Sequence, residues 1–182
     1  MTAAPDGAQP LMAKVKMTGR GRRRESRPDC VFCRIVAGQA PGSTVFEDGR
    51  VLAFMDANPV RRGHVLVIPK AHRAQIWAMA DAEFAAVYRT LPTLVRALAR
   101  ATGADAVNVL SLNGRAGGQT VFHLHFHLIP IHRSRPSLRR EGRRITLEFV
   151  QQPASRAVLD RMARRIRGHL AGARSPGGES PL

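Results

Sequence analysis

Long apolar runs are absent from this sequence of 182 residues. It has no stretch of about eighteen consecutive apolar residues, which is the minimum for a membrane-spanning helix. Its first residues include isolated apolar positions such as Ala3 and Leu11, but no contiguous apolar segment of the secretory type. We therefore expect a soluble, cytoplasmic protein whose 44% hydrophobic content supports one compact domain.

Acidic residues are also scarce, with 13 Asp and Glu against 29 Lys and Arg. Residues 1–28 hold seven basic and two acidic residues, and residues 133–182 hold twelve and four, so residues 29–132 keep ten and seven. The basic excess therefore lies mainly in the flanks, where solvated tails are its simplest explanation. Nucleic-acid binding is the alternative, and a basic tail can also help an anionic substrate to approach.

A phosphate-binding loop of the P-loop or Gly-x-Gly-x-x-Gly type is missing after every predicted strand. Residues 1–28 and 175–182 are predicted to be disordered tails, because they offer too little apolar surface to offset the entropy of ordering. Residues 29–132 form the predicted domain. Residues 133–174 form a basic extension with an amphipathic helix at 154–170, whose apolar stripe contains Val158, Met162 and Ile166.

The predicted domain has the element order β-β-β-α-β-β. Period-two and β-branched segments predict strands at residues 44–47, 51–55, 64–68, 105–112 and 122–131. Apolar residues at helical spacing predict one long helix that begins at an Asp81 cap, has Glu83 in its first turn, kinks at Pro92 and ends at Gly103. This order indicates an α+β fold with a mainly antiparallel five-stranded sheet.

Three histidines alternate with apolar residues between Gln119 and Pro130. Successive side chains of a strand point to opposite faces, so His123, His125 and His127 are predicted to line one face at roughly 7 Å intervals. A strand histidine is often only packed or solvated, and three on one strand can also form a metal cluster. Both alternatives stay open at this point.

The run from His123 to Ile129 resembles the signature of the histidine triad (HIT) family, His-φ-His-φ-His-φ-φ with φ apolar, at every position. Residues 29–35 (DCVFCRI), 54–59 (FMDANP) and 63–72 (GHVLVIPKAH) resemble other landmarks of the family in the expected order. The resemblance covers residues 30–132. It implies a HIT-like fold and a homodimer.

The resemblance also implies a catalytic role for the middle histidine, His125, as the nucleophile that attacks an α-phosphorus. A neutral imidazole has a reference pKa near 6.5, and a covalent intermediate divides a difficult displacement into two easier ones. By the same resemblance His127 and Thr120 lie near the phosphate or leaving group, at a position where the family often has Ser in place of Thr120. His64 would lie behind the triad, whereas His132 and His169 are interpreted as surface histidines.

Further residues are candidates for nucleotide binding. Gly117 and Gly118 let the backbone approach a phosphate, and the side chains of Asn113 and Gln119 are possible donors to it. The resemblance implies that Asp56 holds the ribose hydroxyls and that three apolar residues enclose the base, although these three could equally be plain core. The predicted nucleotide-binding residues are Phe32, Ile35, Phe54, Asp56, Asn113, Gly118 and Gln119.

Cys30 and Cys33 are the chain's two cysteines, and the options for this pair are zinc ligation, a redox pair or inert thiols. A redox role lacks the βαβ context of a thioredoxin motif. His72 and His123 would complete a tetrahedral Cys2His2 site, an arrangement that bacterial members of the family resemble. A structural zinc ion is therefore the favoured prediction, with His123 as ligand and not catalyst.

These observations together predict a hydrolase that acts on a purine nucleotide. Its substrates would be nucleoside phosphoramidates, nucleotidyl adducts or dinucleoside polyphosphates, and its product a nucleoside monophosphate. Three alternatives remain: a phosphorylase or nucleotidyltransferase, a repair enzyme that removes adenylate from nucleic-acid ends, and a non-catalytic nucleotide-binding protein.

Overall fold

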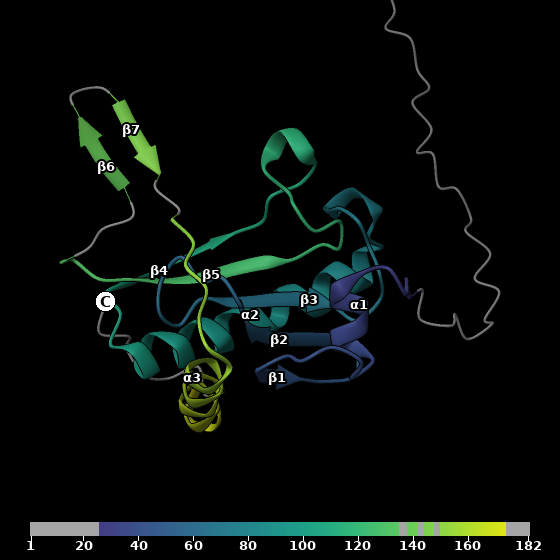
Figure 1. The fold of residues 1–182 in the computed structure, drawn as a ribbon, viewed down its shortest axis with the longest axis horizontal. Helices are drawn as coiled ribbons and strands as arrows, with labels where there is room; N and C mark the ends of the chain where they lie inside the picture. The colour runs from purple at the N-terminus through teal and green to yellow at the C-terminus, as the bar shows by residue number, and fades with distance from the viewer. Residues whose placement is uncertain (1–25, 135–137, 142–143, 148–149, 174–182) are drawn as a thin grey trace, which may run out of the picture.

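A five-stranded antiparallel sheet is the centre of the computed structural model, which describes residues 26–134, 138–141, 144–147 and 150–173. The strand order is β1-β2-β3-β5-β4 (Figure 1). The sheet strands are β1 (Thr44–Glu47), β2 (Val51–Met55), β3 (Val65–Pro69), β4 (Ala106–Leu110) and β5 (Phe126–Ile131). The helices are α1 (Val31–Val36), α2 (Asp81–Thr102) and α3 (Arg156–Gly168), with 3-10 turns η1 (Ile76–Ala78), η2 (Arg115–Gly117) and η3 (Ala171–Ala173). The predicted α+β fold with an antiparallel five-stranded sheet is confirmed.

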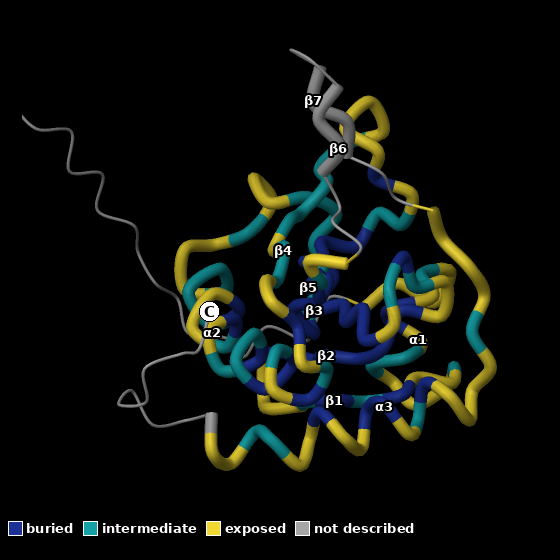
Figure 2. The backbone as a smooth tube through the Cα atoms, turned by 90° about the vertical axis from the view of Figure 1, so that its left-hand side faces the viewer, coloured by how far each residue is buried: buried dark blue, intermediate teal, exposed yellow. Residues whose placement is uncertain are grey.

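Alternation along the strands divides the sheet into two differently covered faces. One face packs against α2 and α3, and its core includes Ala53, Val67 and Leu128. The other face carries Phe54 and Leu66, which pack with Phe32 of α1. Both faces are covered, so β2 and β3 are buried along their whole length, as Figure 2 shows.

The last strand is shorter than predicted. β5 begins at Phe126 and not at residue 122, so His123 and His125 precede the strand and do not line its face. The ladder with β3 ends at the Val67–Phe126 pair. Before Phe126, Leu124 N–H donates to the carbonyl of Arg73, and Nε2 of the His123 ring donates to the carbonyl of Pro69. These bonds replace the ladder and turn the chain out of the strand.

The long helix α2 starts one residue earlier than a cap at Asp81 would require. Ala80 is the N-cap, and the Glu83 carboxylate accepts a hydrogen bond from the Ala80 N–H at 3.1 Å. Asp81 is instead the first helical residue, where its charge favours the positive end of the helix dipole. α2 runs through Pro92 and ends at Gly103, whose φ of 66° provides the left-handed cap.

The C-terminal extension contains the predicted helix and a hairpin that was not predicted. The hairpin pairs β6 (Leu138–Glu141) with β7 (Arg144–Leu147). In α3, Met162 and Ile166 are buried as predicted, but Val158 is 37% exposed. Leu159 and Ala163 complete the buried stripe that packs against β1, β2 and α2 (Figure 1).

Neither predicted tail is fully covered by the structure. Residues 1–25 and 175–182 lie outside the described residues, so their predicted disorder stays a prediction. In the part of the chain that the structure describes, no helix combines the length and apolar character needed to cross a membrane.

Candidate active site and metal cluster

A pocket of about 530 Å³ lies on the α1 side of the sheet. Most of the predicted catalytic and nucleotide-binding residues meet in its wall. The predicted residues that line it are Phe32, Ile35, Phe54, Asp56, Thr120, His125 and His127. They come from α1, from β2 and the residue after it, from the loop before β5 and from β5 itself, and Phe32 and His127 are 95 positions apart in sequence.

The strand register places the pocket residues in a row across the sheet. Phe54 of β2 pairs with Leu66 of β3, and Leu66 pairs with His127 of β5. Paired residues point to the same face, and neighbouring strands are about 4.8 Å apart. The imidazole of His127 and the ring of Phe54 are therefore two strands, or about 10 Å, apart on one surface. This separation suits a ligand with an apolar end and a polar end.

His125 has one ring nitrogen fixed and one left for the pocket. Its Nδ1 lies 2.7 Å from the carbonyl oxygen of His123, which only accepts, so Nδ1 carries the proton. The neutral ring therefore has its lone pair on Nε2. Burial lowers the pKa of His125 below its ordinary value, although the His123 carbonyl and Asp56 oppose this shift. The ring is thus neutral at neutral pH, and its Nε2 is free to act as a base or nucleophile.

A chain of hydrogen bonds connects Asp56 through His64 to His127. The Asp56 carboxylate lies 3.2 Å from Nδ1 of His64, and Nε2 of His64 lies 2.9 Å from Nδ1 of His127. Val60 N–H also approaches His64 Nδ1, at 3.4 Å. We assign the proton to His64 Nδ1, because a lone pair there would face the carboxylate. His64 then accepts a hydrogen bond from His127.

This assignment leaves Nε2 of His127 as the free end of the chain. That atom is buried and has no hydrogen-bond partner among the described residues. Burial, and then the charge of His125, lower the pKa of His64 to about 4. Burial, followed by the charges of His125 and His64, lowers the pKa of His127 to about 3. An orphaned buried nitrogen in a pocket wall indicates a position where a bound molecule completes the hydrogen bonding.

Aromatic rings form the wall between the histidines and the other end of the pocket. The ring of Phe32 meets that of Phe54 edge-on at 5.4 Å between centroids and that of His125 at 5.3 Å. The rings of His125 and His127 lie 4.8 Å apart. Phe32 and Phe54 thus serve as core and as pocket wall at once, and their contact with a base stays a prediction.

Three residues of the loop predicted to bind phosphate make contacts within the protein in this structure. Among the described residues, the pocket lining does not include Asn113, Gly118 or Gln119. Gln119 is buried, with its amide bonded to the Gly114 N–H and to the carbonyls of Ala74 and Val121.

The side chain of Asn113 accepts a hydrogen bond from the Ile76 N–H at 2.8 Å. Gly118 closes η2 with φ 89°, a left-handed conformation that favours glycine. Asn113, Gly118 and Gln119 therefore shape the loop before the histidines, and their contact with a phosphate stays a prediction.

Cys30, Cys33, His72 and His123 gather into one cluster whose possible ligand atoms lie within 4.8 Å of one another. The sulfur of Cys33 lies 3.3 Å from Nδ1 of His72 and 3.6 Å from Nδ1 of His123, and the sulfur of Cys30 lies 3.6 Å from the latter. Tetrahedral zinc, with bonds of 2.3 Å to sulfur and 2.0 Å to nitrogen, would place these atoms about 3.5 Å apart. The cluster could therefore hold a metal ion.

The surroundings of the cluster also suit a metal. Nε2 of His123 lies 2.8 Å from the Pro69 carbonyl, so it carries the proton and leaves the Nδ1 lone pair directed at the cluster. Burial raises the pKa of the Cys30 thiol above its ordinary value, although the Cys33 backbone N–H opposes this shift. Buried sulfur and nitrogen ligands with a fixed histidine tautomer form the donor set that zinc prefers.

Several residues of the pocket wall were not predicted from the sequence. Arg34 of α1, Asn58 after β2, and Gln151 and Arg156 of the C-terminal extension line it. The apolar spacing of Val31, Phe32 and Ile35 could have indicated the helix that carries Arg34. In contrast, the sequence does not distinguish Arg156 from the other arginines of α3.

Comparison with known proteins agrees with this geometry. The family model described as "HIT domain" matches residues 37–134, which is more than half of the chain. An adenylylsulfatase from Arabidopsis thaliana is 41% identical over 102 residues, or 56% of this chain and 52% of that protein. The chain therefore spans about half the length of that relative.

Two further relatives extend the likeness. An adenosine 5'-monophosphoramidase from Schizosaccharomyces pombe is 44% identical over 56% of this chain and 73% of that protein. A zinc-bound histidine triad family protein from Mycobacterium smegmatis superposes with a TM-score of 0.64 at 33% identity, covering 79% of this chain and 94% of that one. The histidine pocket, the sheet that carries it and the match over residues 37–134 lead to one conclusion: this chain belongs to the histidine triad (HIT) family.

Proposed function

We propose that this protein is a nucleotide hydrolase that works through a nucleotidyl intermediate on His125. The observation that carries the proposal is the state of the His125 ring, with Nδ1 bonded to the His123 carbonyl at 2.7 Å and Nε2 left for the pocket. Its lowered pKa keeps that nitrogen unprotonated at neutral pH. A fixed, neutral imidazole is the form in which histidine acts as a nucleophile.

The reaction has two displacements at the same phosphorus. In the first, Nε2 of His125 forms a bond to the α-phosphorus, and the bond from phosphorus to the leaving group breaks with its electron pair going to the leaving group. In the second, water attacks the phosphorus, the bond to Nε2 breaks with its electron pair returning to Nε2, and the proton that the water loses to solvent makes up for the proton that the leaving group took from solvent. The product is a nucleoside monophosphate, and His125 returns to its neutral form.

His127 and its two supporting residues are suited to accept a hydrogen bond from the leaving group or from the attacking water, because Nε2 of His127 carries a lone pair in this tautomer. Nε2 of His127 is the unpartnered end of the Asp56–His64–His127 chain, and Thr120 adds a hydroxyl to the same wall. Asp56 orients His64, which orients His127, so the ring is aimed without reorganisation when the substrate arrives. Thr120 would donate to a phosphate or leaving-group oxygen.

The ribose and base of the nucleotide would lie along the row of paired residues that runs from His127 through Leu66 to Phe54. With the phosphorus at His125, the ribose lies near Asp56, whose carboxylate keeps acceptor capacity beside its contacts to His64 and the Asn58 N–H. The base then lies among Phe32, Ile35 and Phe54. Apolar walls with a few fixed polar groups are the usual composition of such a site.

We also propose that the Cys30–Cys33–His72–His123 cluster binds one structural zinc ion. Zinc there would join α1, the loop after β3 and the segment before β5 into one unit. That unit contains Phe32 and the His123 carbonyl that orients His125. The metal would take no part in the reaction, and its contribution would be to hold the nucleophile's support in place.

The names of the relatives suggest where to look for the substrate. One is a monophosphoramidase and another an adenylylsulfatase, so both names refer to nucleoside monophosphates joined to a leaving group. We therefore propose nucleoside phosphoramidates and related nucleotidyl adducts as the substrate class. Dinucleoside polyphosphates remain in the same class of reaction.

The test is a single-turnover reaction with a nucleoside phosphoramidate, stopped by rapid denaturation. Peptide mass spectrometry should then find a nucleotidyl group on the peptide that contains His125, and His125→Ala should show neither the adduct nor turnover. An adduct on another residue, or near-normal turnover in His125→Ala, would contradict the mechanism. Release of a nucleoside diphosphate when inorganic phosphate is added would indicate a phosphorylase instead.

A further inference from the structure

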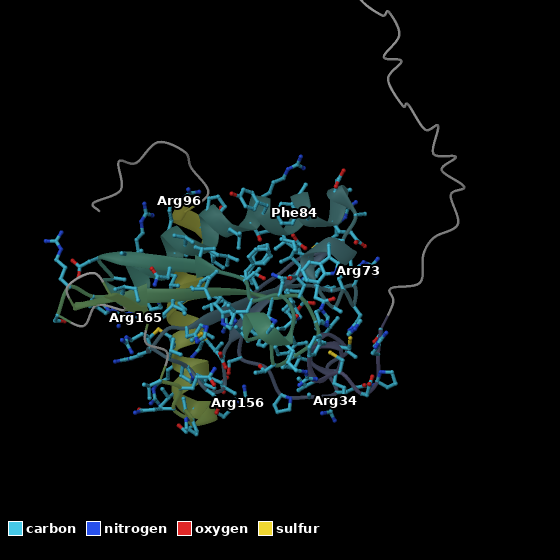
Figure 3. All side chains as sticks on the ribbon, turned by 90° about the horizontal axis from the view of Figure 1, so that it is seen from above. Arg34, Arg73, Phe84, Arg96, Arg156 and Arg165 are labelled. Carbon is cyan, nitrogen blue, oxygen red and sulfur yellow. The ribbon has the colours of Figure 1, made fainter. Side chains whose placement is uncertain are left out.

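Arg156, the first residue of α3, connects the C-terminal extension to the nucleotide pocket. It lies outside the segment that matches the HIT domain, yet it lines the same pocket as His125. Its guanidinium donates from Nη1 to the Ser43 hydroxyl at 3.0 Å and from Nη2 to the Pro41 carbonyl at 3.3 Å. Figure 3 shows Arg156 on the same side of the molecule as Arg34, which also lines the pocket.

The side chain of Arg156 is held in place from two directions. Ser43, which it contacts, donates to the Asp160 carboxylate at 2.5 Å, so the hydroxyl is fixed between β1 and α3. The segment before α3 is bonded to the loop after β2, from Ala154 N–H to the Ala57 carbonyl at 3.1 Å. A guanidinium with this support is oriented before any ligand binds.

Its bonds to Pro41 and Ser43 place the guanidinium of Arg156 beside β1, three strands away from the β5 strand that carries His127. Thr44 of β1 pairs with Phe54, which extends the row from His127 by one more strand. Ser43 precedes Thr44, so the guanidinium lies about three strand spacings, roughly 14 Å, from the strand of His127. Pro41, which Arg156 contacts, precedes Gly42, and Gly42 lies against Ile35, one of the residues proposed to enclose the base. If the phosphorus binds at His125, Arg156 therefore lies beside the place proposed for the base.

We propose that Arg156 selects the base and favours guanine over adenine, an inference that rests on the proposed binding of a nucleotide in this pocket. Arginine has five N–H donors and no acceptor. Two donors contact Pro41 and Ser43, and the others are available for the pocket. Guanine presents O6 and N7 as adjacent acceptors, whereas adenine presents an amino donor beside N7. Only guanine matches a donor-only side chain at both positions.

Calorimetric binding of GMP and AMP to the full chain tests the proposal without any turnover. We expect the wild-type protein to bind GMP roughly ten-fold more tightly than AMP, the size of one charge-assisted hydrogen bond. Arg156→Ala should reduce the difference to about two-fold or less, mainly by weakening GMP. Arg161→Ala is the matched control, because Arg161 is exposed on the same helix and is not among the described residues of the pocket wall.

A second variant keeps the test informative if Arg156→Ala disturbs α3. Arg156→Gln retains a donor for Ser43 and adds an acceptor, so it should shift the preference toward AMP while the melting temperature stays near that of the wild type. Equal affinity for the two nucleotides in the wild type, tighter AMP binding, or equal weakening of both by Arg156→Ala would refute base selection.

The outcomes separate this inference from the proposed function. Selective binding of GMP without hydrolysis would overturn the hydrolase and leave base selection intact. Hydrolysis without a base preference would overturn base selection and leave the hydrolase intact. Failure of both nucleotides to bind would overturn both.

Discussion

Acid should destabilise this protein through the buried pair of His64 and His127. Their pKa values are lowered to about 4 and about 3, mainly by burial, while an unfolded histidine titrates near 6.5. Between those values the unfolded state binds more protons than the folded state. The contribution is therefore fully present above about pH 6.5 and is lost as the pH falls toward the folded pKa values.

The expected size follows from the two pKa values of His64. Linkage gives a loss of about 2 kcal/mol in the free energy of unfolding when the pH is lowered from 7 to 5. His127 would add a similar amount if it titrated independently, but the two rings share a hydrogen bond at 2.9 Å and repel each other when charged. We therefore expect the pair together to lower the free energy of unfolding by about 2–4 kcal/mol between pH 7 and pH 5. This is a large part of the stability of an ordinary domain.

Urea unfolding at several pH values, at constant zinc concentration, measures this loss. His64→Gln should lose about 2 kcal/mol less than the wild type over the same interval, because glutamine does not titrate. Any effect of acid on the metal cluster is common to both proteins and cancels in the difference. His132→Gln, at a partly exposed histidine outside the pocket, is the control. Identical pH dependence in His64→Gln and the wild type would refute the reasoning.

Four other outcomes follow from the site and the extension. His125→Ala should abolish turnover and leave the melting temperature and nucleotide affinity close to wild type; a large stability loss would mean that the ring is structural. Purified protein should contain about one zinc ion per chain, and Cys33→Ser should lower both metal content and melting temperature, which elemental analysis and calorimetry would measure. Deletion from Pro153 onward should cost about 5 kcal/mol or more, because it exposes the buried stripe of α3; unchanged urea unfolding would contradict this. A chain that begins near Pro28 should keep its turnover, since the proposed chemistry uses residues from Cys30 onward, and a steady-state assay that found it inactive would show the division of the chain to be wrong.

Local pattern determined much of the sheet. The predicted bounds of β1 and β2 agree with the structure, because turn residues such as Asp48 and Gly49 separate two short apolar runs. The start of β5 could not be predicted in this way. Alternation continues from Phe122 to Ile131, but the ladder with β3 ends at Phe126, and only the position of the partner strand decides where pairing stops.

The sequence by itself determined the kinds of chemistry that this chain offers. Alternating histidines, a Cys-x-x-Cys pair and the apolar positions of Phe32 and Phe54 were recognisable because each depends on residue type and short-range spacing. Tertiary structure decided which nitrogen of His125 is free, through the bond from Nδ1 to the His123 carbonyl. It also decided that Gln119 supports a loop, because the bonding partners of a buried amide depend on how distant segments meet.

Tertiary structure likewise brought Arg156 into the pocket. On the sequence it is one of several arginines in a polar helix, and its charge alone gives no direction. Packing of Leu159, Met162 and Ile166 against the sheet fixes the rotation of α3, and that rotation turns Arg156 toward Ser43 and the pocket. Short-range pattern can encode what a side chain is able to do, whereas long-range packing decides what it faces.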